Sequence, residues 1–353
     1  MRILPKLNRQ VILSSRPEGI PEAGHFHVVE SPLPDVDDGQ LLVRNLYLSV
    51  EPAMRGWVSA TANYSEPVAL GTVMRSFATG RVEESRHARF KQGDFVTGLF
   101  GWQEYAVVSA DRVVRTITDL DIPLSTSLGV LGLNGLTAYV GLLEIGRPKP
   151  GETVVVSTAA GSVGSIVGQI AKLNGCRTVG IAGGATKVAM CVCEFGFDDA
   201  IDYKSGDLDS RLASACPAGV DVYFDNTAGA ISDSVMRRLN VGARVAICGT
   251  ASVAAWDPPP LGPRIERALL TKRARIEGFL AFDYEHKRPE ALRFLSRCIR
   301  DGSLRYREEI LEGLHEAPGA IARLYRGENM GKLLVRLADH GATSASASHP
   351  DPA

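Results

Sequence analysis

The sequence has no surplus of charge of either sign and no long uninterrupted apolar run. Its 353 residues include 39 Lys and Arg against 40 Asp and Glu, so no general basic field is present to attract nucleic acid or an anionic membrane. The N-terminal residues lack the apolar segment of a secretory signal, and polar side chains and glycines interrupt the uncharged stretch 125–143. We expect a cytoplasmic protein whose partners are small molecules, with no nucleic acid and no membrane among them.

Cysteine is absent before Cys176, and the later cysteines show no paired spacing. They stand at positions 176, 191, 193, 216, 248 and 298, which is not the pattern of a disulfide framework. Cys191 and Cys193 lie one residue apart in a helix-like stretch, without the C-x-x-C pairs or the histidine spacing that tetrahedral zinc ligation uses. We therefore expect no disulfide framework and no metal site.

Length and composition predict two domains. The 45% hydrophobic content is enough for a large core, and short β-like runs separated by Pro and Gly up to about residue 125 are typical of a barrel-like β domain. The apolar segment 127–146 is expected to form a helix that crosses to a second domain. Residues 339–353, rich in Ala, Ser, His and Pro, are expected to be a disordered tail.

The stretch 153–173 combines a β-branched run, a turn of small residues and a helix-like apolar repeat. The turn, AAGSVG, is a G-x-G-x-x-G motif in which Ala159 replaces the first glycine. Gly161 would allow close approach to a pyrophosphate, and Gly164 would allow close packing of the helix on the strand. The motif thus predicts an anion site at the N-terminus of a helix.

Strand-like runs alternate with helix-like segments after this motif, at 177–182, 220–224 and 244–248. Such alternation is typical of a parallel, doubly wound sheet. The motif alone is weak, because small-residue turns between a strand and a helix also occur without a ligand. With these flanks, the sequence predicts an α/β fold in which the motif binds a dinucleotide.

The type of dinucleotide is indicated by a missing carboxylate. An Asp or Glu about 20 residues beyond the glycines would hold the 2′-hydroxyl of an NAD ribose, but no carboxylate occurs between Thr153 and Cys193. Lys187 stands there instead, beside the backbone N–H groups of Gly183 and Gly184. These features favour a 2′-phosphate and hence NADP, although Lys187 could also be an ordinary solvated lysine at the start of a surface helix.

Nine further stretches carry a resemblance to a known family. They are VEPAMRGW (50–57), ALGTVMRSFATG (69–80), GWQEYAVV (101–108), LGLNGLTAYVGLLEIG (131–146), AAGSVGSIVGQIAKL (159–173), FDNTAG (224–229), RVAICG (244–249), GFLAFDY (278–284) and GENMGKLLV (327–335). Through them nearly the whole chain resembles the zinc-independent medium-chain dehydrogenase/reductases, in particular the leukotriene B4 dehydrogenase, prostaglandin reductase and curcumin reductase branch.

The resemblance implies a fold, a cofactor and an assembly. It implies a GroES-like β-barrel domain over residues 1–129 and 304–338, and a Rossmann domain over residues 130–303. NADPH would lie in the cleft between them, and the protein would be a homodimer. The expected reaction is reduction of the carbon–carbon double bond of α,β-unsaturated ketones and aldehydes, by hydride transfer to the β-carbon. Two alternatives are an NADPH quinone reductase and a non-catalytic NADPH-binding protein.

The resemblance also assigns residues to the cofactor. The positions that match the cofactor-binding residues of the family are Gly161, Ser162, Val163, Gly164, Gly183, Lys187, Tyr203, Asn226, Cys248, Gly249, Phe279, Asn329 and Thr137. Lys187 and Tyr203 would meet the 2′-phosphate. Asn226, Phe279 and Asn329 would lie on the nicotinamide side.

The substrate pocket both matches the family and departs from it. Tyr64 matches a pocket tyrosine and is the catalytic candidate, as donor to the enolate oxygen, although it could simply be an aromatic that holds a loop. This chain has Ala53 where the family's D-P-Y-M-R motif has tyrosine, and Asn134 where its M-P-G-L-T-A-Y motif has proline. It has Ala254 where the family's I-S-x-Y-N motif has a second tyrosine. Loss of two tyrosines predicts a roomier, less polar pocket, filled by Trp256 or by a bulkier substrate.

Overall fold

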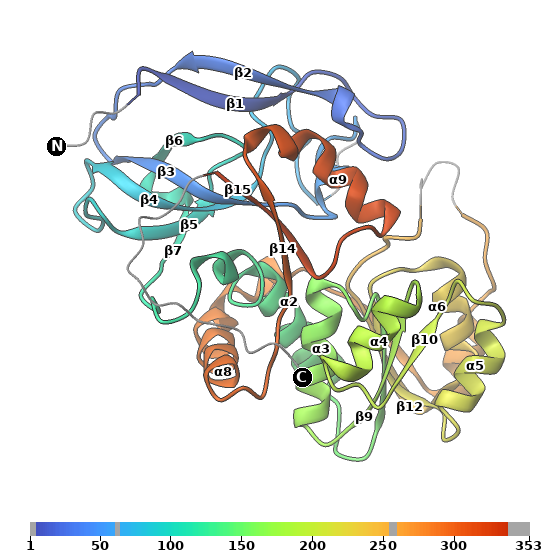
Figure 1. Cartoon of the computed structure of the whole chain (residues 1–353). Helices are drawn as coiled ribbons and strands as arrows, with labels where there is room; N and C mark the ends of the chain where they lie inside the picture. The colour runs from blue at the N-terminus through green and yellow to red at the C-terminus, as the bar shows by residue number, and fades with distance from the viewer. Residues whose placement is uncertain (1–4, 61–63, 254–259, 338–353) are drawn as a thin grey trace, which may run out of the picture.

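The computed structural model describes residues 5–60, 64–253 and 260–337, whose strands form a mixed sheet, a parallel sheet and a separate two-stranded ribbon (Figure 1). The ribbon and the mixed sheet lie together in one half of the molecule, and the parallel sheet lies in the other. No helix within these described ranges is long and apolar enough to cross a membrane.

The mixed sheet is built from two distant parts of the chain. Its strands are β3 (Gln40–Ser49), β4 (Phe77–Ser85), β5 (Phe95–Leu99), β6 (Tyr105–Ser109), β7 (Val113–Thr116), β14 (Glu308–Glu312) and β15 (Lys332–Arg336). In the described chain their order is β14-β15-β3-β4-β5-β7, with β6 paired to β3. The ribbon of β1 (Leu7–Leu13) and β2 (Phe26–Pro32) contributes Val11 and Phe26 to the same core.

Strand β3 changes its partner part-way along its length. Its first half pairs with β6, and its last residues pair with β15, where Ser49 lies opposite Leu334. The opposite edge of β3 pairs with β4 through two register shifts. A bulged strand bends, and this bend brings the end of β3 against the start of β15.

Short helices connect the strands of this half. They are η1 (Ala23–His25), α1 (Met54–Trp57), η2 (Ala110–Arg112), η3 (Leu124–Leu128), η6 (Leu314–Glu316) and α9 (Ala317–Arg326). The uncharged crossing segment forms α2 (Leu133–Val140), which continues into the π-helical turn η4 (Gly141–Gly146). A Cβ on Gly141 would lie 2.3 Å from the ring of Phe279, so the close approach at the start of η4 needs glycine.

The parallel sheet has the strand order of a dinucleotide-binding fold. Its strands are β8 (Thr153–Ser157), β9 (Arg177–Ala182), β10 (Asp199–Asp202), β11 (Val220–Asp225), β12 (Leu239–Ile247) and β13 (Arg275–Gly278). Within the described residues the order is β10-β9-β8-β11-β12-β13, and each recorded pairing is parallel. The order reverses between β8 and β11, which is where such sheets bind their ligands.

Helices cover both faces of this sheet. They are α3 (Ser162–Leu173), α4 (Ala185–Cys193), α5 (Leu208–Ala215), α6 (Gly229–Met236), α7 (Glu266–Lys272), η5 (Ala281–Lys287) and α8 (Arg288–Arg300). Val154 and Val156 pack in one core cluster with residues of α3 and α4, and Val155 packs in another with residues of α5 and α6. The uninterrupted valine run therefore has the pattern of a strand buried on both sides. The domain boundaries given above remain a prediction.

Candidate cofactor and substrate site

The phosphate loop lies between β8 and α3, at the reversal point of the parallel sheet. Gly161 precedes the first turn of α3 in an extended conformation, so Ser162 and Val163 open the helix. A Cβ on Gly164 would lie 2.3 Å from the carbonyl oxygen of Thr158. Glycine is therefore required for the helix to pack this closely on the loop, and the first N–H groups of α3 face the reversal point.

The positions expected to meet a 2′-phosphate lie beyond β9 and β10. A Cβ on Gly183 would lie 2.9 Å from the ring of Tyr203 and 3.0 Å from Cε of Lys204, so these residues are packed together. Burial lowers the pKa of Lys187, and the neighbouring ammonium of Lys204 lowers it further. Two cations held this close favour an anion between them. Lys204 is a residue that the sequence analysis did not select.

Two of the positions expected on the nicotinamide side, Asn226 and Phe279, follow β11 and β13, and the cofactor-binding candidates Cys248 and Gly249 follow β12. The Asn226 amide donates to the carbonyl of Ser157 at 2.7 Å. The backbone N–H groups of Cys248 and Gly249 donate to the carbonyl of Asp225 at 2.8 and 3.1 Å. Phe279 follows β13, and its ring meets that of Phe224 edge to face at 6.1 Å. These residues come from different strands, but they share the edge at which a dinucleotide would lie.

The thiol of Cys248 is not suited to nucleophilic chemistry. Burial raises its pKa to about 12, and the nearby Asp225 carboxylate acts in the same direction. A nucleophilic or metal-binding cysteine needs a thiolate, so this group stays neutral at physiological pH.

The loop between α9 and β15 borders the phosphate loop. Gly331 forms an isolated parallel bridge with Gly161, and the Lys187 ammonium donates to the carbonyl of Gly327 at 2.8 Å. The Asn329 amide donates to the carbonyl of Gly331 at 2.8 Å. Residues 327–331 therefore link Lys187 with the phosphate loop, and they bring Asn329 to the same place.

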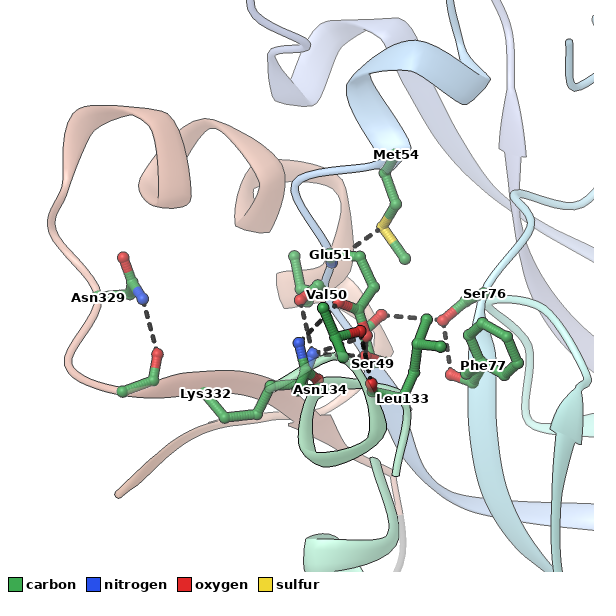
Figure 2. Close-up of polar contacts among 12 residues, drawn as sticks. Ser49, Val50, Glu51, Met54, Ser76, Phe77, Leu133, Asn134, Asn329 and Lys332 are labelled. Carbon is green, nitrogen blue, oxygen red and sulfur yellow. Dashed lines mark hydrogen bonds and ion pairs between the residues drawn. The ribbon is translucent and has the colours of Figure 1, made fainter. Parts of the chain in front are cut away.

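A buried ion pair lies beside this loop, where β15 meets the end of β3 (Figure 2). The Lys332 ammonium donates to Ser49 Oγ at 2.6 Å, to the carbonyl of Val50 at 2.9 Å and to Glu51 Oε1 at 2.9 Å. The side chains of Lys332 and Glu51 are only 4% and 6% exposed. Burial raises the pKa of the Glu308 carboxyl, and Lys332 opposes that shift. The ammonium of Lys332 is thus paired directly with Glu51, and its charge also reaches the carboxyl of Glu308.

Asn134 adjoins this ion pair from α2. Its amide nitrogen lies 3.5 Å from Glu51 Oε2, and Figure 2 shows its side chain beside Ser49 and Lys332. Its Oδ1 atom is buried, and the described residues offer it no hydrogen-bond partner. Thr137, one turn further along α2, donates to the carbonyl of Leu133 at 2.8 Å. Asn134, which differs from the family pattern, therefore lies against Glu51. Glu51 belongs to the motif in which Ala53 replaces the family's tyrosine.

Tyr64 lies in the connection between α1 and β4. Burial raises the pKa of its hydroxyl, the neighbouring indole of Trp57 opposes that shift, and Glu51 and Cys248 raise the pKa further. The tyrosine is therefore within electrostatic reach of the end of β3 and of the end of β12. Its side chain is 50% exposed, so the hydroxyl is accessible to a small molecule.

The other predicted pocket residues divide between described and undescribed parts of the chain. Ala53 directly precedes α1 and packs against the core of the mixed sheet. Ala254 and Trp256 lie outside the described residues.

No group of three or more His, Cys, Asp or Glu side chains in the described ranges could hold a metal ion. Cys191 and Cys193 both lie on α4, but the first is buried and the second is exposed. The two thiols therefore do not share a face of the helix.

Comparisons with known proteins identify the family. A model described as the N-terminal domain of oxidoreductase matches residues 9–116, and one described as zinc-binding dehydrogenase matches residues 162–297. The chain is 43% identical over 336 residues to the NADPH-dependent curcumin reductase of Escherichia coli, covering 94% of this chain and 97% of the relative. It is 38% identical to the NADP-dependent 2-alkenal reductase of Nicotiana tabacum, covering 93% and 97%.

Solved structures show the same fold. The structure of CurA from Vibrio vulnificus in complex with NADPH is 41% identical and covers 94% of this chain and 99% of its own, with a TM-score of 0.89. The predicted pairing of a barrel-like β domain with a doubly wound parallel sheet is thereby confirmed, as is the resemblance to the medium-chain dehydrogenase/reductases. The chain belongs to the medium-chain dehydrogenase/reductase family, among oxidoreductases that include curcumin, pulegone and prostaglandin reductases.

Proposed function

We propose that the protein is an NADPH-dependent reductase of α,β-unsaturated ketones and aldehydes, and that it saturates their carbon–carbon double bond. The observation that carries the proposal is the phosphate loop at the reversal point of the parallel sheet, beside the segment 327–331 that contacts both this loop and Lys187. Relatives that cover almost the whole chain are a curcumin reductase, an alkenal reductase and a pulegone reductase.

The residues at the reversal point of the sheet fit NADPH. Gly161 and Gly164 leave room for a pyrophosphate at the N-terminus of α3, and Lys187 and Lys204 supply positive charge for a 2′-phosphate. The bound dinucleotide supplies the hydride that is added to the β-carbon of the substrate.

The protein's part in the reaction is to position the substrate and stabilise the developing charge. Hydride addition to the β-carbon moves negative charge to the carbonyl oxygen, which then needs a hydrogen-bond donor. We assign the Tyr64 hydroxyl as this donor, and burial keeps it protonated by raising its pKa. The α-carbon of the enolate takes its proton from water. This step requires no acidic side chain of the protein. The neutral thiol of Cys248 takes no part as a nucleophile.

A substrate screen tests this function. Purified protein with NADPH would be offered a linear 2-alkenal, a diaryl enone and a para-quinone, and both NADPH oxidation and the product would be followed. We expect turnover of enones with loss of the C=C bond and retention of the carbonyl. Exclusive turnover of the quinone would make the protein a quinone reductase. NADPH binding without turnover of any acceptor would make it a binding protein only.

Lys187→Ala tests the assignment of the cofactor. We expect this variant to weaken NADPH binding by about tenfold or more and to leave NADH binding nearly unchanged, because only NADPH has a phosphate for the ammonium to meet. Calorimetric titration with both dinucleotides measures the effect.

Lys172→Ala is the matched control for Lys187→Ala. It removes another helical lysine, which is ion-paired with Asp198 on the surface of α3. This control should change neither affinity. Equal losses of NADPH and NADH affinity in Lys187→Ala would instead mean that the lysine acts by tethering residue Gly327.

A further inference from the structure

Tyr325, near the end of α9, holds the segment that carries Ala53. Its hydroxyl donates to the carbonyl oxygen of Pro52 at 2.8 Å, which belongs to the peptide that joins Pro52 to Ala53. The guanidinium of Arg55 lies over its ring, 5.1 Å from the ring centroid. The tyrosine therefore contacts the chain on both sides of the position at which this sequence has lost a family tyrosine.

The position of Tyr325 is fixed by the packing of α9. Ala317, Ala320 and Ile321 bury one face of the helix, and Tyr325 itself packs against the core cluster that also receives Ala53. An ion pair of 2.6 Å between Arg326 and Glu22 holds the end of the helix. In Figure 1, this end of α9 points toward the half that contains the parallel sheet. The packing of α9 therefore fixes the position of the Tyr325 side chain.

Tyr325 also lies near the proposed catalytic tyrosine. Burial raises the pKa of its hydroxyl, Arg55 opposes the shift, and Tyr64 raises the pKa further. The two phenols are therefore within electrostatic reach of each other. Tyr64 in turn is within reach of Glu51 and Cys248. Because Tyr325 contacts Pro52 and Arg55 on either side of Ala53, which the resemblance assigns to the substrate pocket, its ring borders the place where the proposed function puts the enone.

We propose that Tyr325 supplies, from α9, the aromatic pocket wall that the family's D-P-Y-M-R motif supplies from position 53, and that it thereby sets the size of enone the pocket accepts. The inference rests on the proposed function for its substrate class. Because the hydroxyl is committed to the carbonyl of Pro52, Tyr325 acts through its ring and does not donate to the substrate. Rings at positions 53 and 325 would then compete for the same space.

Size selectivity gives the first test. We expect Tyr325→Leu to raise kcat/KM for a diaryl enone relative to a linear 2-alkenal by about tenfold, as a change of a few methylenes in pocket volume does. Tyr325→Phe is the matched control, since it keeps the ring and loses only the bond to Pro52, and it should retain the selectivity of the unaltered protein. Equal changes for both enones in Tyr325→Leu would overturn the proposal.

A double-variant cycle gives the second test and needs no substrate. Ala53→Tyr alone should lower the melting temperature and weaken NADPH binding, because the new ring meets that of Tyr325. The same change in a Tyr325→Leu background should be tolerated. Additive effects would overturn the proposal.

The two tests separate the inference from the function. If no enone is turned over, the proposed function fails. A non-additive cycle would still show that side chains at positions 53 and 325 occupy the same space. If enones are reduced and the cycle is additive, the function stands and the role of Tyr325 fails.

Discussion

Replacement of Tyr64 by phenylalanine is expected to lower kcat and kcat/KM together, by about a hundredfold, which is typical for loss of one oxyanion donor. The effect should fall on both constants because a hydrogen bond to the carbonyl oxygen strengthens as negative charge develops there. Steady-state kinetics with a linear 2-alkenal measure the change. A fall of less than threefold would remove Tyr64 from the mechanism.

The affinity for NADPH is the control for Tyr64→Phe. The ring is retained, so the packing of this side chain and the dissociation constant of the dinucleotide should not change. A pH profile adds a second check. Because the pKa of Tyr64 is raised above its ordinary value of about 10, the hydroxyl keeps its proton throughout the neutral and mildly alkaline range. We therefore expect no loss of kcat from this group below about pH 10.

Replacement of Lys332 by methionine is expected to lower the free energy of unfolding by about 3–5 kcal/mol, because it leaves the buried carboxylate of Glu51 without its counter-charge. Methionine keeps most of the side-chain volume, so the loss reports the missing ammonium and not a cavity. The ion pair also joins β15 to the end of β3, so loss of activity should accompany loss of stability. Urea-induced unfolding gives the free energy directly.

Two further variants isolate the buried pair. Glu51→Leu combined with Lys332→Met removes both charges and should recover most of the lost stability, since replacing a buried pair by apolar residues is often neutral. Arg237→Met breaks the exposed pair with Asp209 and should cost about 1 kcal/mol or less. A Lys332→Met variant as stable as Arg237→Met would show that the buried pair contributes nothing measurable.

Local sequence patterns were sufficient for the dinucleotide half. The valines of β8, the small-residue turn and the apolar repeat of α3 follow one another in the chain, so their contacts are decided within about twenty residues. Gly175, which has a positive φ of 75°, follows the end of that helix, and glycine is the usual residue at such a position. The strands that follow alternate with helices, and a parallel arrangement with right-handed crossovers then leaves little freedom in the topology.

Contacts between distant parts of the chain were not predictable in the same way. Lys332 meets Glu51 across 281 positions, and Tyr325 meets Pro52 across 273. No periodicity connects residues at such separations. The available signal for Lys332 was its place at the start of the apolar run Leu333 to Val335, where a lone charge indicates a buried partner. For Tyr325 the neighbouring sequence gives no such signal, because a single aromatic residue on an amphipathic helix usually packs in the core.

The departures from the family pattern had more than one physical meaning. Ala53 and Asn134 were both interpreted as changes to the substrate pocket. The structure places Asn134 against Glu51, so that departure also concerns the buried ion pair, and it places Tyr325 beside the segment of Ala53. A missing side chain in a motif predicts a space, but only the folded chain shows what borders it.

Because β3 pairs with β15 near the C-terminus, the order in which the two sheets can fold during synthesis is set by the chain. Ser49 pairs with Leu334, so the mixed sheet waits for β15. All strands of the parallel sheet, by contrast, lie between Thr153 and Gly278 and can pair as soon as that stretch has left the ribosome. Strands that are synthesised early and whose edges stay unpaired are prone to aggregation, from which chaperones protect the chain. The half that is translated first is thus the half that is finished last.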